Sequence, residues 1–405
     1  MGKPKIRFKG YEDAWEQRKL DSWGTFYYGR SCPKWSVTED ATIPCIRYGE
    51  LYTKFGAKID RVYSYTNMPP ENLRFSKGTE VLIPRVGEDP MDYNHCTWLS
   101  MPDVAIGEMI SVFNTDNNPL FTATMFNATL QNEFAMRVEG GSVTNLYFEK
   151  LKNIEVSFPS IQEQEKIAAY FENLDHLITL HQRKCEETKS LKKYMLQKMF
   201  PENGKCVPEI RFSGFSDAWE QRKLEEYLGV SKEKNRDESF GKDDVLSVSG
   251  EYGIVNQIEF QGRSFAGASV ANYGVVEGGD VVYTKSPLKS NPYGIIKTNK
   301  GKTGIVSTLY AVYKPKNNVG AEFVQIYFEL DSRMNSYMHP LVNKGAKNDM
   351  KVSDENALKG SVIFPKIDEQ KAISKYFAQL DHLITLHQHK CDELQKLKKF
   401  MLQNM

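Results

Sequence analysis

The sequence predicts an α+β fold in which two mixed α/β domains are joined by two long antiparallel coiled-coil helices, the whole being a pseudo-two-fold duplication. Three observations support this fold. The 405 residues are enough for two to four domains. Two segments each occur twice, about 205 residues apart, which is far longer than a solenoid period and indicates paired half-molecules. One of these segments is long, amphipathic and free of helix breakers.

The repeated segments agree closely between their copies. Pro4–Leu20 and Pro208–Leu224 share 13 of 17 residues at an offset of 204. Phe158–Met199 and Phe364–Met405 share 27 of 42 residues at an offset of 206. The stretches between them show almost no resemblance to each other. The chain is therefore a duplication whose two intervening regions differ.

The longer repeated segment predicts the two helices. Neither Gly nor Pro occurs from Ile161 to Met199, and Pro159 and Pro365 precede the two copies, as is typical of a helix start. Apolar residues recur at spacings of three and four, which indicates a coiled-coil seam. At about 1.5 Å per residue, the first helix would span roughly 58 Å. The seam residues are Ile167, Phe171, Leu174 and Ile178 in the first copy and Ile373, Phe377, Leu380 and Ile384 in the second.

The apolar stripe of the first helix is wider than a two-stranded seam requires. Leu177, Leu180, Leu191 and Tyr194 extend it. Packing against the core of its own domain explains such a stripe and is the more common case. A surface for a further partner explains it as well, so both interpretations stay open.

The two intervening regions, 21–157 and 225–363, each predict a mixed α+β globule. Short runs of β-branched and aromatic residues bounded by Gly, Pro or Asn are typical of strands. A helical period without breakers predicts a helix over Glu322–Met334. The strand-like runs are Glu80–Pro84, Ala105–Phe113, Asp280–Thr284 and Gly304–Tyr313.

Composition excludes several classes of protein. The 53 Lys and Arg residues balance 52 Asp and Glu, so the chain is not a uniformly basic nucleic-acid binder. The six cysteines form no C-x-x-C pair, which indicates reduced thiols and neither a zinc site nor a disulfide framework. No apolar run approaches the roughly 20 residues of a membrane span, and no signal-peptide core follows Met1. We therefore expect a cytoplasmic protein without a metal site or membrane association.

No catalytic motif is complete. Lys300–Thr303 resembles the end of a phosphate-binding loop, but six residues separate Gly294 from Gly301 where the motif requires four. Asn67–Pro70 departs from the Asn-Pro-Pro-aromatic pattern of amino-methyltransferases, because a methionine intervenes and Glu71 replaces the aromatic residue. We expect no catalytic residue in this chain and no cofactor bound by it.

The duplicated order of these segments resembles the specificity subunit of bacterial type I restriction-modification systems. The motif F-P-x-I-x-E-Q-x-x-I occurs at Phe158–Ile167 and again at Phe364–Ile373. The leader P-x-I-R-F-x-G-[FY]-x-x-x-W-E-Q-R-K-L precedes each variable region. Each motif alone is moderately specific, whereas their order around unrelated regions is highly specific. The resemblance covers essentially the whole chain.

The resemblance implies an organisation and a set of partners. Residues 1–157 and 204–363 would be target-recognition domains, and residues 158–203 and 364–405 would be helical spacers. Each recognition domain would read one half of a split, asymmetric sequence in double-stranded DNA, with the helices as a ruler. Two modification subunits would carry S-adenosylmethionine and methylate adenine. Restriction subunits would use ATP and Mg to translocate and cleave the DNA, and this chain would be non-catalytic.

Local charge selects candidate DNA contacts in the second region. Residues 281–321 contain seven lysines and no Asp or Glu, interleaved with Ser, Thr, Asn and Tyr. This composition suits contacts to phosphates and base edges, although a solvated surface loop would look the same. The candidates are Lys285, Lys289, Asn291, Tyr293, Lys297, Lys300 and Lys302, together with Lys344, Lys347 and Asn348 in a Gly-containing segment before the last strand.

The first region offers a more scattered set. Residues 21–157 hold 12 cations and 17 anions, so no basic run stands out. Arg can pair bidentately with guanine, which makes its arginines reasonable candidates. The candidates are Arg30, Lys34, Arg47, Tyr48, Arg61 and Arg85, with Asn145 in a Gly-rich segment that corresponds in position to the one around Lys347.

Two other functions compete with a DNA-specificity subunit. A coiled-coil scaffold whose globular domains bind proteins would have the same helices and would not need the lysine-rich segment 281–321. A self-sufficient methyltransferase or nuclease would need the catalytic motifs that this sequence lacks.

Overall fold

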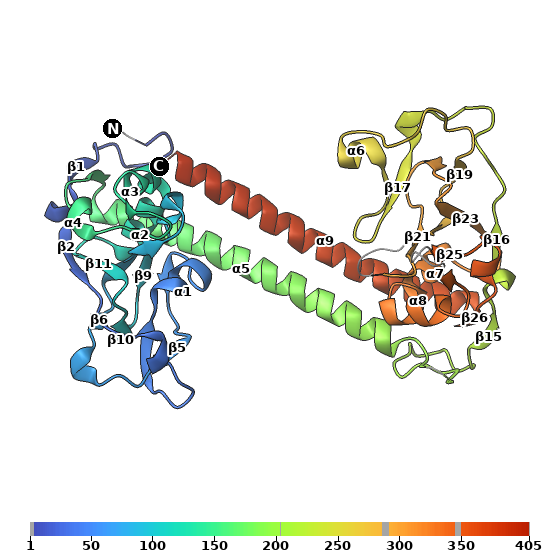
Figure 1. Ribbon diagram of the computed structural model, residues 1–405, viewed down its shortest axis with the longest axis horizontal. Helices are drawn as coiled ribbons and strands as arrows, with labels where there is room; N and C mark the ends of the chain where they lie inside the picture. Colours follow the sequence, from blue (N-terminus) through green and yellow to red (C-terminus); the bar gives the residue numbers. More distant parts are fainter. Residues whose placement is uncertain (1–3, 203, 286–290, 345–349, 405) are drawn as a thin grey trace. The chain divides into compact units, whose positions relative to one another are not determined.

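The computed structural model describes residues 4–202, 204–285, 291–344 and 350–404. The chain forms two compact units: unit 1 comprises Met1–His181 and His389–Met405, and unit 2 comprises Gln182–Gln388 (Figure 1). Each unit combines mixed sheets with one part of each long helix. The predicted α+β class is confirmed.

The main sheet of unit 1 has five strands in the order β2-β11-β7-β9-β4. All neighbours are antiparallel except β9 and β4. Four residues of β7 form the centre of the core, since its side chains from Val81 to Pro84 are all buried. The strands are β2 (Gly24–Tyr28), β11 (Ile110–Thr115), β7 (Glu80–Pro84), β9 (Thr97–Leu99) and β4 (Lys58–Ile59).

A second sheet of unit 1 has the order β5-β3-β10-β6, with β5 (Ser64–Thr66), β3 (Ile43–Ile46), β10 (Pro102–Ile106) and β6 (Phe75–Lys77). The expected single strand Ala105–Phe113 is wrong, because it is divided between β10 and β11. The turn between them packs against β3: Gly107 donates its N–H to the carbonyl of Ile46 at 2.9 Å, and a Cβ at this glycine would collide with the same carbonyl.

Unit 1 is completed by a hairpin, four helices and an edge pair. Helix α1 (Tyr48–Thr53) follows β3, while α2 (Pro119–Thr129), α3 (Gln131–Ala135) and α4 (Phe148–Leu151) follow β11. The hairpin β12 (Glu139–Gly140) and β13 (Thr144–Asn145) pairs with β8 (Val86–Gly87). Strand β1 (Glu16–Lys19), from the leader, pairs with β14 (Glu155–Phe158), which leads into the long helix.

Unit 2 repeats this plan with a smaller main sheet, β16-β23-β20-β21. Its expected strand Gly304–Tyr313 is divided into β22 and β23, and the expected helix Glu322–Met334 is interrupted at Phe328–Leu330 between α7 (Ala321–Tyr327) and α8 (Asp331–Met338). The main strands are β16 (Leu228–Val230), β23 (Tyr310–Pro315), β20 (Val281–Thr284) and β21 (Ile296–Thr298).

Four two-stranded sheets and one more helix complete unit 2. The pairs are β15 (Glu220–Lys223) with β26 (Ser361–Phe364), β17 (Leu246–Ser249) with β18 (Gly253–Asn256), β19 (Gly274–Val276) with β22 (Gly304–Val306), and β24 (Asn343–Lys344) with β25 (Met350–Lys351). Helix α6 (Gln257–Gln261) follows β18.

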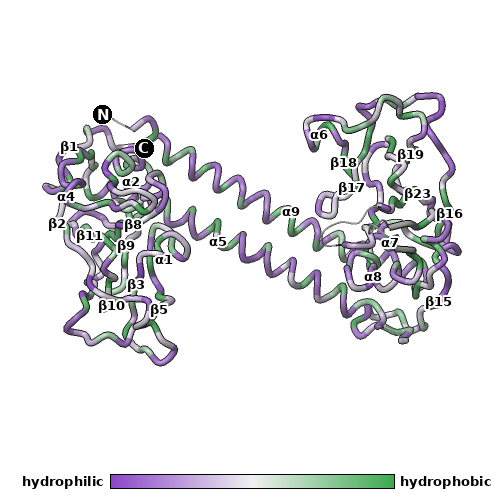
Figure 2. Tube along the Cα trace, viewed as in Figure 1, coloured by the Kyte–Doolittle hydropathy of each residue, from purple (hydrophilic) through white to green (hydrophobic). Residues whose placement is uncertain are grey.

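The two long helices are α5 (Ile161–Lys198) and α9 (Ile367–Gln403). Within unit 1, Lys398 near the end of α9 pairs with Asp175 of α5 at 2.5 Å. Within unit 2, the equivalent Lys192 near the end of α5 pairs with Asp381 of α9 at 2.6 Å. The helices are therefore antiparallel in each unit. Hydrophilic and hydrophobic residues alternate along both helices, as an amphipathic pattern requires (Figure 2).

The predicted seam residues lie mostly inside the two units. Those of α5 are buried in the core of unit 1, which they share with Phe158 of β14. Those of α9 belong to the core of unit 2, except Ile384, which is half-buried. The seam thus packs each helix against a recognition domain as well as against the other helix.

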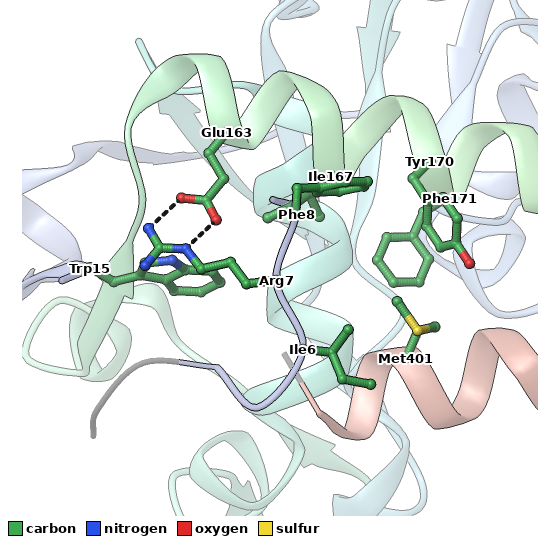
Figure 3. Close-up of a pocket in the computed structure, with 9 residues that line it drawn as sticks. All are labelled: Ile6, Arg7, Phe8, Trp15, Glu163, Ile167, Tyr170, Phe171 and Met401. Atoms are coloured by element: carbon green, nitrogen blue, oxygen red, sulfur yellow. Dashed lines mark hydrogen bonds and ion pairs between the residues drawn. The ribbon is translucent and has the colours of Figure 1, made fainter. Parts of the chain in front are cut away.

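The repeated motif F-P-x-I-x-E-Q is explained by a joint that occurs once in each unit. In unit 1 the guanidinium of Arg7, in the leader, donates from Nε and Nη2 to both carboxylate oxygens of Glu163 at 2.7 and 2.8 Å (Figure 3). The neighbouring Gln164 accepts from the N–H of Asn118 at 3.0 Å and donates to the carbonyl of Pro159 at 2.9 Å. The motif therefore ties the leader and the start of α2 to the start of α5.

Unit 2 contains the same joint. Arg211 donates to both carboxylate oxygens of Glu369 at 2.7 Å. Gln370 accepts from the N–H of Gly320, before α7, at 3.0 Å and donates to the carbonyl of Pro365 at 2.9 Å. Identical roles at both positions show that the motif is a structural requirement of the duplication.

A small apolar cavity of about 180 Å³ lies beside the joint of unit 1. Figure 3 shows its lining, which comes from the leader, α5 and the end of α9. The leader also reaches α9 through its backbone, because the N–H of Ile6 donates to the carbonyl of Asn404. In unit 2 the equivalent Ile210 donates to the carbonyl of Lys198 at 3.0 Å.

We predict that Glu163→Ala lowers the free energy of unfolding of unit 1 by about 3 kcal/mol, because the largely buried guanidinium of Arg7 loses its counter-charge. Urea denaturation followed by tryptophan fluorescence measures the change. Glu16→Ala is the matched control, since Glu16 pairs with Arg18 on an exposed strand. A loss no larger than that of the control would show that the joint does not stabilise the unit.

Candidate nucleic-acid interface

Arg85 lies where β7 ends, at one edge of the main sheet of unit 1. Its backbone N–H donates to the carbonyl of Met109 at 3.2 Å, and its carbonyl accepts from the N–H of Leu146 at 2.8 Å. The guanidinium lies over the rings of Tyr28 and Tyr147, at 4.9 and 5.8 Å from their centroids. The cation is therefore held in place by aromatic faces.

Two further predicted arginines reach the same turn between β10 and β11. The N–H of Arg30 donates to the carbonyl of Ile106 at 2.7 Å, and the backbone of Arg47 lies against Gly107. Arg30 is exposed and Arg47 is half-buried. Arg30, Arg47 and Arg85, scattered in the sequence, thus gather around one turn.

Arg74 joins this group although its sequence context did not single it out. Its Nη1 donates to the carbonyl of Tyr28 at 2.7 Å, and its guanidinium lies over the ring of Tyr27 at 5.0 Å. Burial and nearby Glu149 raise the pKa of Tyr28, so its phenol stays protonated and hydrogen-bonded to that carboxylate at 2.6 Å. Only the spatial pairing of β6 with β10 brings Arg74 to this edge.

Asn145 belongs to the same edge through the hairpin. It pairs with Val86 of β8, the residue directly after Arg85. Thr144 is buried, and its carbonyl accepts from the hydroxyl of Tyr93 at 2.6 Å. The hairpin is therefore fixed to the core at one strand while the turn Gly140–Val143 is exposed.

The other candidates of the first region lie on different elements. Lys34 is exposed beside Trp35, whose side chain is 71% exposed. Arg61 lies over the ring of Tyr63 at 5.1 Å. Tyr48 starts α1 and is exposed. These residues, with the exposed Tyr65 of β5, surround the second sheet and form a separate aromatic and cationic surface.

In unit 2, Lys285 lies at the end of β20. Its backbone N–H donates to the carbonyl of Leu309 at 2.9 Å, and its Nζ pairs with Asp354 at 2.9 Å. Lys300 and Lys302 are exposed in the loop after β21. Lys302 lines a cleft of about 690 Å³ together with Asn256 and Phe260.

Three candidates of the lysine-rich segment are buried. Lys297 of β21 is 8% exposed, and this burial lowers the pKa of its ammonium. Asn291 donates to Asp331 at 2.5 Å, and the ring of Tyr293 packs against His339. Their side chains therefore do not lie on the surface that DNA would contact, and the alternation of a buried strand explains why composition alone did not separate them from Lys300.

The remaining candidates are only partly described. Lys289, Lys347 and Asn348 lie outside the described residues, and for Lys344 the structure gives the strand β24 alone. Sequence inspection did not single out the aromatic side chains of unit 2 that are exposed near this region. They are Tyr252, Phe260 and Phe265, the last of which lies under the guanidinium of Arg263 at 4.5 Å.

Within the ranges described by the structure, no group of three His, Cys, Asp or Glu side chains is arranged to hold a metal ion. Over the same ranges, no helix is long and apolar enough to cross a membrane.

Comparison with known proteins agrees with this architecture. Residues 104–190, from β10 into α5, match the family described as the type I restriction modification DNA specificity domain. Over 268 residues the chain is 26% identical to a putative type I restriction enzyme MjaX specificity subunit of Methanocaldococcus jannaschii. That alignment covers 62% of this chain and 58% of the relative, so the chain is matched to little more than half of that protein.

The fold is also that of a solved specificity subunit. The crystal structure of the type I restriction-modification S subunit from M. genitalium superimposes with a TM-score of 0.60 at 14% identity, over 99% of this chain and 98% of that one. Likeness at this identity shows the fold. The fold and the matched domain define a DNA-specificity protein, and the chain is a relative of type I restriction-modification specificity subunits, as its duplicated motifs predicted.

We predict that Lys297→Met leaves the affinity for DNA unchanged and raises the free energy of unfolding of unit 2 by about 1 kcal/mol, because it replaces a buried charge with an apolar side chain of similar length. Fluorescence anisotropy and urea denaturation measure the two quantities. Lys300→Ala, which removes an exposed cation three residues away, should weaken DNA binding without changing stability. A weakened affinity of Lys297→Met alone would place Lys297 at the interface.

Proposed function

We propose that this chain is the sequence-specific DNA-binding subunit of a type I restriction-modification complex and reads a bipartite, asymmetric target. The observation that carries the proposal is the duplication itself. Two units share their leader, joint and helices, whereas regions 21–157 and 225–363 are unrelated in sequence. Selection for two different ligands of the same class explains a shared scaffold with divergent surfaces.

Each unit presents side chains suited to DNA at an edge of its main sheet. In unit 1 these are Arg30, Arg74 and Arg85 with their tyrosine neighbours, and in unit 2 Lys285 with the exposed Lys300 and Lys302. Cations neutralise phosphates, and planar or polar side chains on nearby loops contact base edges. One half-site per unit follows from this arrangement.

The long helices would set the separation of the two half-sites. An uninterrupted helix of 38 residues, such as α5, measures about 57 Å. Both helices run from one unit into the other, and ion pairs between them recur at equivalent positions. A rod without breakers therefore links the two units and would act as a ruler.

The helices also offer surfaces for partner subunits. Three apolar positions are exposed in both copies, namely Leu177 and Leu383, Leu191 and Leu397, and Tyr194 and Phe400. Because exposed large apolar side chains at repeated positions are typical of interaction surfaces, we propose two equivalent docking sites for modification subunits.

The chemistry would reside in the partners. The modification subunits would hold S-adenosylmethionine and methylate adenine, and the restriction subunits would supply ATP- and Mg-dependent translocation and cleavage. This chain would act in the cytoplasm without catalytic residues of its own, giving the complex its address on double-stranded DNA.

A protein-binding coiled-coil scaffold is the second candidate, favoured by the same exposed apolar positions of the helices. It differs in what the two units bind. A scaffold would give no sequence-specific methylation when combined with a modification subunit, whereas a specificity subunit would.

We predict that replacing residues 225–363 with the corresponding region of another specificity subunit changes one half of the methylated sequence and leaves the other half intact, because each unit reads separately. Sequencing that detects methylated adenine, in cells that carry the modification subunits, gives the motif. Methylation of an unchanged sequence would contradict the proposal, and the parental chain in the same cells is the control.

We predict that inserting seven residues into both helices, after His181 and after His387, lengthens the gap between half-sites by about three base pairs, because seven residues add about 10.5 Å and a base pair occupies about 3.4 Å. The same methylation mapping measures the gap. Insertion into one helix alone should abolish methylation, since the ion pairs between the helices lose register. An unaltered gap after the double insertion would refute the ruler.

A further inference from the structure

Arg85 and Lys285 occupy the same position in the two units. Pro84 lies opposite Ile110 in the ladder of β7 and β11, and Thr284 lies opposite Tyr310 in the ladder of β20 and β23. The next residue in each case, Arg85 or Lys285, donates its N–H to the carbonyl just before the long strand, at 3.2 Å to Met109 and 2.9 Å to Leu309. The two cations are structural counterparts.

A second cation is shared in the same way. Phe26 pairs with Phe113 in unit 1, and Val230 pairs with Tyr313 in unit 2, so β2 and β16 correspond at the offset of 204 found for the leader. At that offset Arg30 corresponds to Lys234, and both are exposed. Each unit therefore has cations at two equivalent positions next to the same edge of its main sheet.

Equivalent cations in regions of unrelated sequence point to a ligand feature that both half-sites share. Two half-sites of different base sequence have only the sugar-phosphate backbone in common, because base edges differ between them. A residue that reads a base has no reason to recur at the same place in both units, whereas a residue that binds a phosphate does.

The local contacts agree with a role as a charge. Nη1 of Arg85 donates to the carbonyl of Glu108 at 3.3 Å, and its Nε is buried without a hydrogen-bond partner. The open fork of two N–H groups that pairs bidentately with guanine is therefore not free. Lys285 has no fork at all and is a point charge, oriented here by Asp354.

We propose that Arg85 and Lys285 bind phosphates of the two half-sites and read no base, anchoring each unit on the DNA backbone in the same orientation. This inference rests on the proposed function and refines it, because Arg85 was first considered as a reader of guanine. Base reading then falls to cationic and aromatic groups that the units do not share, such as Arg61 with Tyr63 in unit 1 and Arg263 with Phe265 in unit 2.

The test uses the full chain assembled with its modification subunits and compares Arg85→Ala, Arg85→Lys, Lys285→Ala and the double alanine variant. Each single alanine variant should weaken binding about three- to tenfold and make the plot of log affinity against log salt shallower by about 0.9, with about twice that change in the double variant. Arg85→Lys should retain the slope, because the charge is kept. The methylated sequence should stay the same in all four.

Lys9→Ala is the matched control, since it removes one exposed positive charge from the leader. Circular dichroism melting of each variant establishes that it is folded. A base position that becomes relaxed in Arg85→Ala would overturn the proposal and make Arg85 a reader. An unchanged salt slope in folded Arg85→Ala and Lys285→Ala would overturn it as well, by removing both residues from the interface. If the unsubstituted complex methylates no bipartite sequence, the proposed function itself fails, which is a separate outcome.

Discussion

The buried ion pair between a leader arginine and the glutamate of the first helical turn is the interaction on which both units depend. Glu163 and Glu369 are fully or almost fully buried, so each needs the two charge-assisted hydrogen bonds that Arg7 or Arg211 supplies. The adjacent Gln164 or Gln370 joins the helix start to the first helix after the long strand. Three elements far apart in the sequence are thereby fixed at one point.

This joint separates what must be kept from what is free to change. The leader, the helix start and the aromatic core around Phe158 or Phe364 are repeated, because they hold a sheet on a helix. Loops at the far edge of each main sheet do not enter the joint, so their sequences can diverge without loss of the fold. A duplicated scaffold with two different recognition surfaces is the physical consequence.

Much of the fold could be predicted from the sequence, and less of the site. Strand Glu80–Pro84 and helix Ile161–Lys198 follow from local pattern, because an apolar run and a breaker-free period decide them. The division of Ala105–Phe113 depends on the turn at Gly107 packing against β3, which is a tertiary contact. Lys297 and Lys300 look alike in a lysine-rich segment, yet strand pairing buries one and exposes the other. The convergence of Arg30, Arg74 and Arg85, and the equivalence of Arg85 with Lys285, exist only in the folded chain.

The central claim is that one chain with two unlike units specifies one bipartite DNA sequence. Mapping of methylated adenine across the genome of cells that carry this chain with its modification subunits tests it most directly, with cells lacking the chain as reference. The account predicts one new motif with two unlike half-sites separated by a gap of constant length. Methylation that is absent, or that marks a single continuous sequence, would contradict it.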